Sequence, residues 1–112
     1  MKINGVDFDA VIKDAIKAAK AVADISWPAL QDYVENIGRG IANDALFLKK
    51  KQDSGEFEEA DARMFMEDQK IVARMRLRSL AIVTMQIAED IINAIAGVFK
   101  SAINTAIGWE VF

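Results

Sequence analysis

Apolar residues recur at helical spacing along most of the chain. In the first part they stand three or four positions apart, with charged residues on the opposite face, as in an amphipathic helix. This first set comprises Phe8, Val11, Ile12, Ala15, Ile16, Ala19, Val22 and Ala23. A similar spacing continues through Leu30, Val34, Ile37, Ile41 and Leu48. We therefore predict helices over about residues 7–25 and 28–51, the second opening with a proline, which suits the first turn of a helix.

The stretch KKKQDSG at 49–55 is the strongest turn signal in the chain. Basic residues favour a helix end, and Asp, Ser and Gly favour a turn. We predict a hairpin turn at about 52–55 and further helices over about 55–78 and 80–108. Because only Gly97 interrupts this second half and no proline does, the last two helices are predicted either as separate helices or as one continuous helix.

The apolar face changes sides within this second half. If a helix turns by about 100° per residue, one side of its first part carries Phe57, Met64, Phe65, Ile71, Val72 and Met75. The methionines and phenylalanines of this half are expected in the core, with an adaptable binding groove as the alternative; they are Met64, Met66, Met75, Met85, Phe57, Phe65 and Phe99. The tail carries its apolar residues on the opposite side, so the stretch from 80 to 87, where the faces change over, is expected to be deeply buried.

The apolar arc of the tail spans about 200° of the helix, whereas a surface helix needs only about 100° or somewhat more. One neighbouring helix cannot cover it, and a second copy is the most economical source of the missing contact, since homo-oligomers are most often two-fold dimers. The predicted interface consists of Leu80, Val83, Ile87, Ile91, Ile95, Val98, Phe99, Ala102 and Trp109. The predicted fold is thus one all-α domain over residues 1–112, an elongated helical hairpin or small helical bundle that dimerisation completes into a four-helix or larger bundle.

A membrane is a second possible environment for the tail. Glu89, Asp90 and Lys100 interrupt it, which disfavours a membrane-spanning helix. Helices that lie on a membrane surface usually carry lysine and arginine on the polar face, but two of these three charges are acidic. Membrane contact is therefore the less favoured alternative to a dimer.

The amino-acid composition excludes several kinds of catalytic and metal-binding chemistry. The 112 residues include no cysteine and no histidine, which removes thiol nucleophiles and the commonest general base and metal ligand. The net charge of −3 argues against nucleic-acid binding. No catalytic motif is present, no cofactor is predicted, and the amino terminus does not resemble a secretory signal, so we expect a cytoplasmic protein that is not an enzyme.

Three acids lie on or beside apolar positions near the predicted hairpin turn: Asp44, Asp61 and Asp68. An oxygen-only site for magnesium or calcium is chemically conceivable there. The simpler interpretation is that these acids pair with arginines or stay hydrated. Asp44, Asp61 and Asp68 are therefore weak metal candidates.

These patterns favour a non-catalytic helical protein that oligomerises or binds a protein partner. The alternative is a membrane-surface or pore-associated amphipathic protein, and a carboxylate-lined bundle for a metal or other ligand is third.

Overall fold

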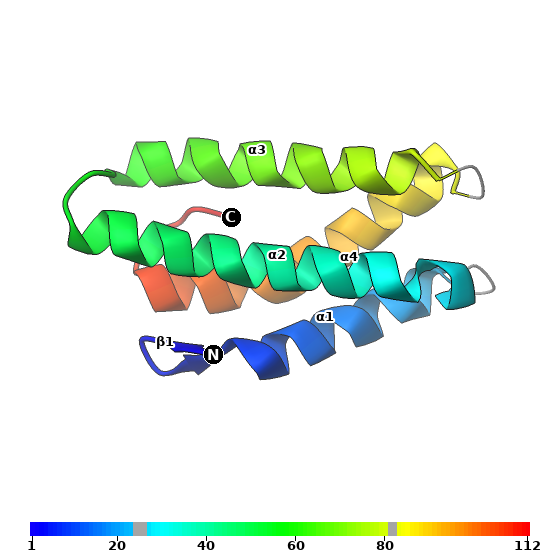
Figure 1. Ribbon diagram of the computed structural model, residues 1–112, viewed down its shortest axis with the longest axis horizontal. Helices are drawn as coiled ribbons and strands as arrows, with labels where there is room; N and C mark the ends of the chain where they lie inside the picture. The colour runs from blue at the N-terminus through cyan, green and yellow to red at the C-terminus, as the bar shows by residue number, and fades with distance from the viewer. Residues whose placement is uncertain (24–26, 81–82) are drawn as a thin grey trace.

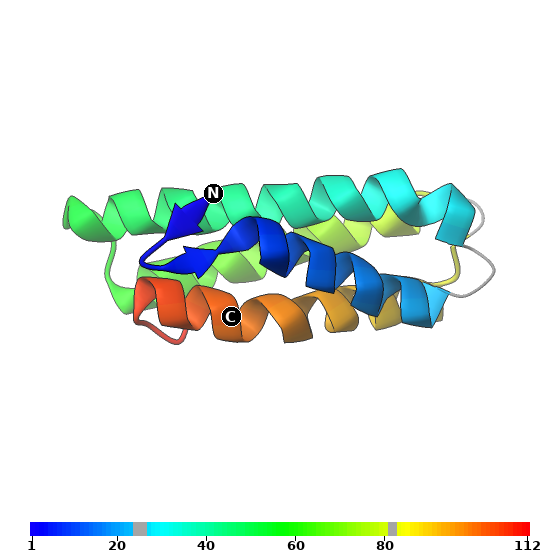
Figure 2. The ribbon, with the colours of Figure 1, turned by 90° about the horizontal axis from the view of Figure 1, so that it is seen from below.

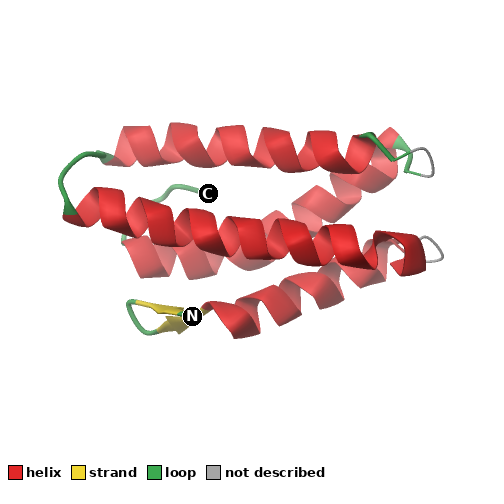
Figure 3. Ribbon diagram, viewed as in Figure 1, coloured by secondary structure: helices red, strands yellow, loops and turns green. Residues whose placement is uncertain are grey.

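The computed structural model describes residues 1–23, 27–80 and 83–112. A short hairpin of β1 (Lys2–Ile3) and β2 (Val6–Asp7) is followed by helices α1 (Phe8–Ala23), α2 (Trp27–Asp53), α3 (Glu59–Arg78) and α4 (Met85–Ile107) (Figure 1). Helices dominate the described residues, as Figure 3 shows, and the predicted all-α class is confirmed.

The amino-terminal hairpin is a feature that the helical spacing did not predict. Lys2 pairs with Asp7 and Ile3 with Val6 in an antiparallel register. Asn4 and Gly5 connect the strands with φ angles of 50° and 82°. Two such positive values suit a tight hairpin turn, for which Asn-Gly is the favoured dipeptide. This dipeptide was therefore a readable signal for the hairpin.

The helices form an elongated bundle measuring 44 × 24 × 17 Å. α2 and α3 run antiparallel along the long axis, and α3 lies on the side of the molecule away from α1 (Figure 1). Figure 2 shows α1 lying between α2 and α4. α1 packs mainly on α4 and next on α2, whereas α3 packs on α4 and α2.

The turn between α2 and α3 overlaps the predicted residues 52–55 at Ser54 and Gly55, because α2 extends through Gln52 and Asp53. Gly55 has a φ of 76°, a conformation that favours glycine. The Glu56 carboxylate accepts hydrogen bonds from Lys51 Nζ (2.7 Å) and Ser54 Oγ (3.0 Å). α3 begins at Glu59 rather than near 55. At this start of the helix, Glu58 N donates a hydrogen bond to Asp61 Oδ2 at 3.0 Å. The helix starts late because Glu56 belongs to the turn.

α3 and α4 are separate helices. α3 ends at Arg78, and Ser79 Oγ donates to the carbonyl oxygen of Arg76 at 2.7 Å. α4 begins at Met85, where Thr84 caps it by accepting a hydrogen bond from Ile87 N at 3.2 Å. The predicted start at 80 is therefore several residues early. The stretch 80–87, expected to be deeply buried, is not: Thr84, Met85 and Gln86 are exposed, because they form the start of α4 at the end of the bundle. Residues 81 and 82 of this stretch and Ile25, the predicted end of the first helix, lie outside the described residues.

The core runs the length of the bundle between α1, α2 and α4, with one face of α3 closing it. Its largest fully buried side chains are Phe8, Leu30, Val34, Leu48, Met66, Leu77, Ile91, Ile95, Phe99, Ile103 and Val111. Among the residues that the structure describes, no helix combines the length and apolarity that crossing a membrane requires.

Candidate functional site

The apolar tail is covered by its own chain. Ile91, Ile95 and Phe99 are fully buried and Val83 is nearly so. The other predicted interface residues are partly buried and pack against the same core: Leu80, Ile87, Val98, Ala102 and Trp109. The expectation that one chain cannot cover the tail does not hold for these residues, because α1 and α2 together pack against α4. The tail is therefore not the most exposed apolar surface of this chain.

Among the described residues, the most exposed apolar surface lies on α3. Met64 is 70% exposed, Met75 63%, Ile71 48% and Val72 40%. We name these four side chains the outer face of α3. The sequence pattern placed them in the core, and this is the main correction that the structure makes. α3 instead turns inward a face made of Ala62, Met66, Ala73 and Leu77.

Small residues explain which face of α3 is buried. Ala62 and Ala73 allow close approach to the bundle, while Met66 and Leu77 fill the remaining space, and all four are buried. The apolar side chains of the outer face are larger, but two exposed acids, Asp61 and Asp68, lie beside them on the same side of the helix. Burying those carboxylates without partners would cost more than burying the alanine-containing face.

Polar contacts reinforce this orientation along the edge of α3. Arg74 Nε lies 2.6 Å from Glu89 Oε1 of α4, an ion pair between the two helices. Near the other end, Arg63 Nε donates to the carbonyl oxygen of Glu110 at 3.2 Å, and Glu59 Oε1 accepts from Glu110 N at 3.2 Å. The carboxyl-terminal segment and α4 thus hold α3 with its outer face turned away from the bundle.

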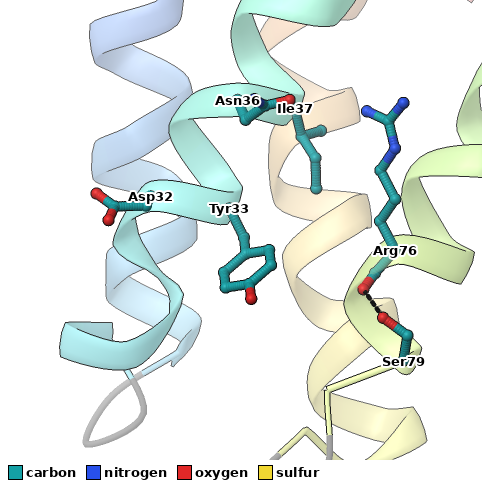
Figure 4. A pocket seen from close by; sticks show the side chains of 6 residues that line it. All are labelled: Asp32, Tyr33, Asn36, Ile37, Arg76 and Ser79. Carbon is teal, nitrogen blue, oxygen red and sulfur yellow. Dashed lines mark hydrogen bonds between the residues drawn. The ribbon is translucent and has the colours of Figure 1, made fainter.

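A groove between α2 and α3 adjoins the outer face. Its wider end is an open hollow of about 410 Å³ lined by Asp32, Tyr33, Asn36, Ile37, Arg76 and Ser79. In Figure 4, Tyr33 and Ile37 project from α2 toward α3, and Asp32 points away from Arg76. Val72 and Ala73 line the narrower continuation, which also contains Asp44 and Gln69. The groove therefore combines apolar side chains with several polar and charged ones.

Three aromatic rings pack together at the end of the α2–α3 pair that lies beside the turn. Phe47 of α2 stacks on Phe65 of α3, with ring centroids 5.0 Å apart and planes at 29°. Phe57 lies against both rings, 6.0 Å from Phe47 and 6.3 Å from Phe65. This cluster joins the two helices beside the turn and extends the apolar surface, because Phe47 remains partly exposed.

Asp44 and Arg76 are the charged groups in the narrow part of the groove. Half-burial raises the pKa of Asp44 to about 6, and the positive charge of Arg76 acts in the opposite direction. Among the ion pairs of the described residues, none includes either of these two side chains. The groove therefore holds a half-buried acid with a raised pKa beside an exposed arginine.

The three weak metal candidates occupy different environments. Asp44 lies in the groove, Asp61 caps the start of α3, and Asp68 is exposed on α3 between Met64 and Ile71. Over residues 1–23, 27–80 and 83–112, no three acids gather in a way that would hold a metal ion. The structure therefore does not bring the predicted ligands together.

Comparison with known proteins finds no relative: no family model, curated protein or solved structure matches the chain. The functional interpretation therefore depends on the chemistry of the outer face of α3 and the neighbouring groove.

Proposed function

We propose that the protein is a non-catalytic helical module that self-associates through the outer face of α3. The observation that carries this proposal is the exposure of Met64, Ile71, Val72 and Met75 on one helix. Large contiguous apolar surfaces on soluble proteins commonly mark interaction sites. The partner is a second copy of the chain, so the predicted dimer is retained and its interface moves from the tail to α3.

The charges around this surface favour a protein partner over a lipid surface. Helices that bind anionic membranes usually present lysine and arginine on their polar face. The exposed side of α3 instead mixes both signs, since Asp61, Glu67 and Asp68 share it with Arg63 and Arg78. Such a mixture can be complementary to itself, which is what a two-fold interface between identical chains requires.

The methionines also suit an association surface. Met64 and Met75 are the two most exposed side chains of the outer face, and methionine adapts its shape to an irregular partner because its side chain is unbranched and polarizable. The groove between α2 and α3 lies next to the outer face, and side chains of the partner can extend into it.

Sedimentation equilibrium over a range of micromolar concentrations tests the proposal. The mean mass of the wild type should rise with concentration from that of one chain toward that of two. Ile71→Glu should abolish this rise, because it places a charge in the middle of the apolar surface. Val22→Glu is the matched control, since Val22 is an aliphatic residue of α1 with 40% exposure, and it should associate like the wild type.

Two results would refute the proposal. One is a wild-type protein that stays a single chain at hundreds of micromolar. The other is a dimer that Ile71→Glu leaves intact, which would place the interface elsewhere. Circular dichroism on each variant verifies that the helices are retained.

A further inference from the structure

Six exposed positions form a continuous seam along α3. They alternate at spacings of three and four residues, the repeat by which two helices pack side by side. From the start of the helix to its end they are Asp61, Met64, Asp68, Ile71, Met75 and Arg78. This seam lies opposite the buried face of Ala62, Met66, Ala73 and Leu77, so it points away from the bundle.

The two ends of the seam carry opposite charges that cannot meet within one chain. Asp61 and Arg78 are separated by about 25 Å at a helical rise of 1.5 Å per residue. Neither Asp68 nor Arg78 has an ion-pair partner in the described part of the chain. Asp61 uses one carboxylate oxygen to cap the helix, as Glu58 N donates to Oδ2.

We propose that α3 packs antiparallel against α3 of a second copy, with Asp61 of each chain opposite Arg78 of the other. This inference rests on the proposed self-association and adds its orientation and register. The two-fold axis then passes between Asp68 and Ile71, and Met64 of one chain lies opposite Met75 of the other. A parallel arrangement in register would instead set Asp61 against Asp61 and Arg78 against Arg78, which like charges disfavour.

One of the two rows that flank the seam agrees with the same register. On the side of α2, Phe65 and Val72 come next to the seam, and the antiparallel arrangement brings Phe65 of one copy toward Val72 of the other. On the side of α4, Glu67 and Arg74 come next to the seam, but each already has an ion-pair partner in its own chain, Lys70 and Glu89 respectively. The flank on the side of α2 therefore contributes apolar contact twice, because the interface is two-fold symmetric.

Asp68 weakens the proposed interface. It lies opposite Ile71 of the second copy, close to the axis, where its carboxylate is partly desolvated and meets no positive charge. Shifting the helices by one heptad would leave four of the six seam positions of each copy in contact and would separate Met64 from Met75 of the other copy, although one such shift would set Asp68 opposite Arg78. The full length of the seam and the pairing of Asp61 with Arg78 at its ends therefore favour the proposed register.

Disulfide trapping tests this register directly, since the chain contains no cysteine. Met64→Cys and Met75→Cys are made as separate variants, one carrying a mass tag, and are mixed and oxidised. The mixture should form a cross-linked heterodimer as its main covalent product. Each variant alone should cross-link poorly, because two copies of the same position lie about 16 Å apart along the axis, beyond the reach of a disulfide.

Met85→Cys provides the control, because Met85 is about as exposed as Met75 but begins α4. It should cross-link with neither α3 variant. Homodimeric cross-linking of Met64→Cys alone at the rate of the mixture would overturn the antiparallel arrangement. A wild-type dimer in sedimentation with no cross-link in the mixture would overturn the register and leave self-association standing, whereas a wild-type monomer would overturn both.

Discussion

The rings of Phe8 at the start of α1 and Phe99 in α4 stack with their centroids 6.5 Å apart and their planes at 25°. Both side chains are fully buried. This contact joins the beginning of the helical chain to the middle of its apolar tail. The apolar tail is therefore buried by residues of its own chain, although it is too apolar for an isolated helix.

Phe99→Ala should lower the free energy of unfolding by about 3–5 kcal/mol, because it removes a fully buried ring and leaves a cavity. Urea denaturation followed by circular dichroism measures the loss at a concentration where the chain is a monomer. Met64→Ala serves as the comparison and should change stability by no more than about 0.5 kcal/mol, as expected for an exposed side chain. Equal losses in the two variants would contradict the assignment of the tail to the core and of Met64 to the surface.

The free energy of unfolding should fall as the pH rises from about 4 to 6, because Asp44 loses its proton in a half-buried position. Burial raises the pKa of Asp44 from 3.8 to about 6 in the folded chain. The folded state therefore binds the proton more tightly than the unfolded state, and the free energy of unfolding falls as the pH rises through this window. Asp44→Asn cannot ionise, so the variant should not lose stability in this way. It should be more stable than the wild type by on the order of 1 kcal/mol at about pH 7.5, after allowance for solvent screening of a half-exposed group.

The measurement is the difference in unfolding free energy between Asp44→Asn and the wild type at about pH 4 and about pH 7.5, so that other titrating groups cancel. The advantage of the variant should be small at the lower pH and grow with the pH. A difference that does not depend on pH would contradict the half-buried position of Asp44 in the groove.

Asp68→Leu should tighten self-association. The substitution replaces a carboxylate beside the proposed two-fold axis by an apolar side chain, and it occurs twice in the dimer, so the dissociation constant should fall by at least about tenfold. Sedimentation equilibrium measures the constant. Asp14→Leu adds the same side chain to an exposed position of α1 and should leave the constant unchanged, whereas unchanged or weaker association of Asp68→Leu would argue against the seam.

Much of the helical architecture could be predicted from the spacing of apolar residues. The turn after α2 was readable in Asp53, Ser54 and Gly55, which disfavour a continuing helix, whereas Gln52 is a good helix former and lies in α2. Gln52 also contributes a long-range contact that local pattern cannot predict, since its Nε2 donates to the carbonyl oxygen of Ile107 at 2.8 Å.

The buried face of α3 could not be predicted in the same way. Hydrophobic spacing identifies an apolar side of a helix, but the neighbours decide which side is covered. On α3 the inward face pairs Ala62 and Ala73 with Met66 and Leu77, whereas the larger apolar side chains share the opposite face with acids. The presence of Asp61 and Asp68 on that face was the signal that it remains outside.

The methionine methyl groups offer the most direct test of the outer face of α3 as the association surface. The chain has five methionines, of which Met64, Met75 and Met85 are similarly exposed and Met66 is fully buried. In carbon-13 methyl NMR spectra recorded over a dilution series, the resonances of Met64 and Met75 should shift with concentration, while those of Met85 and Met66 stay fixed. Shifts at Met85 without shifts at Met64 and Met75, or no concentration dependence at any methionine, would contradict the account.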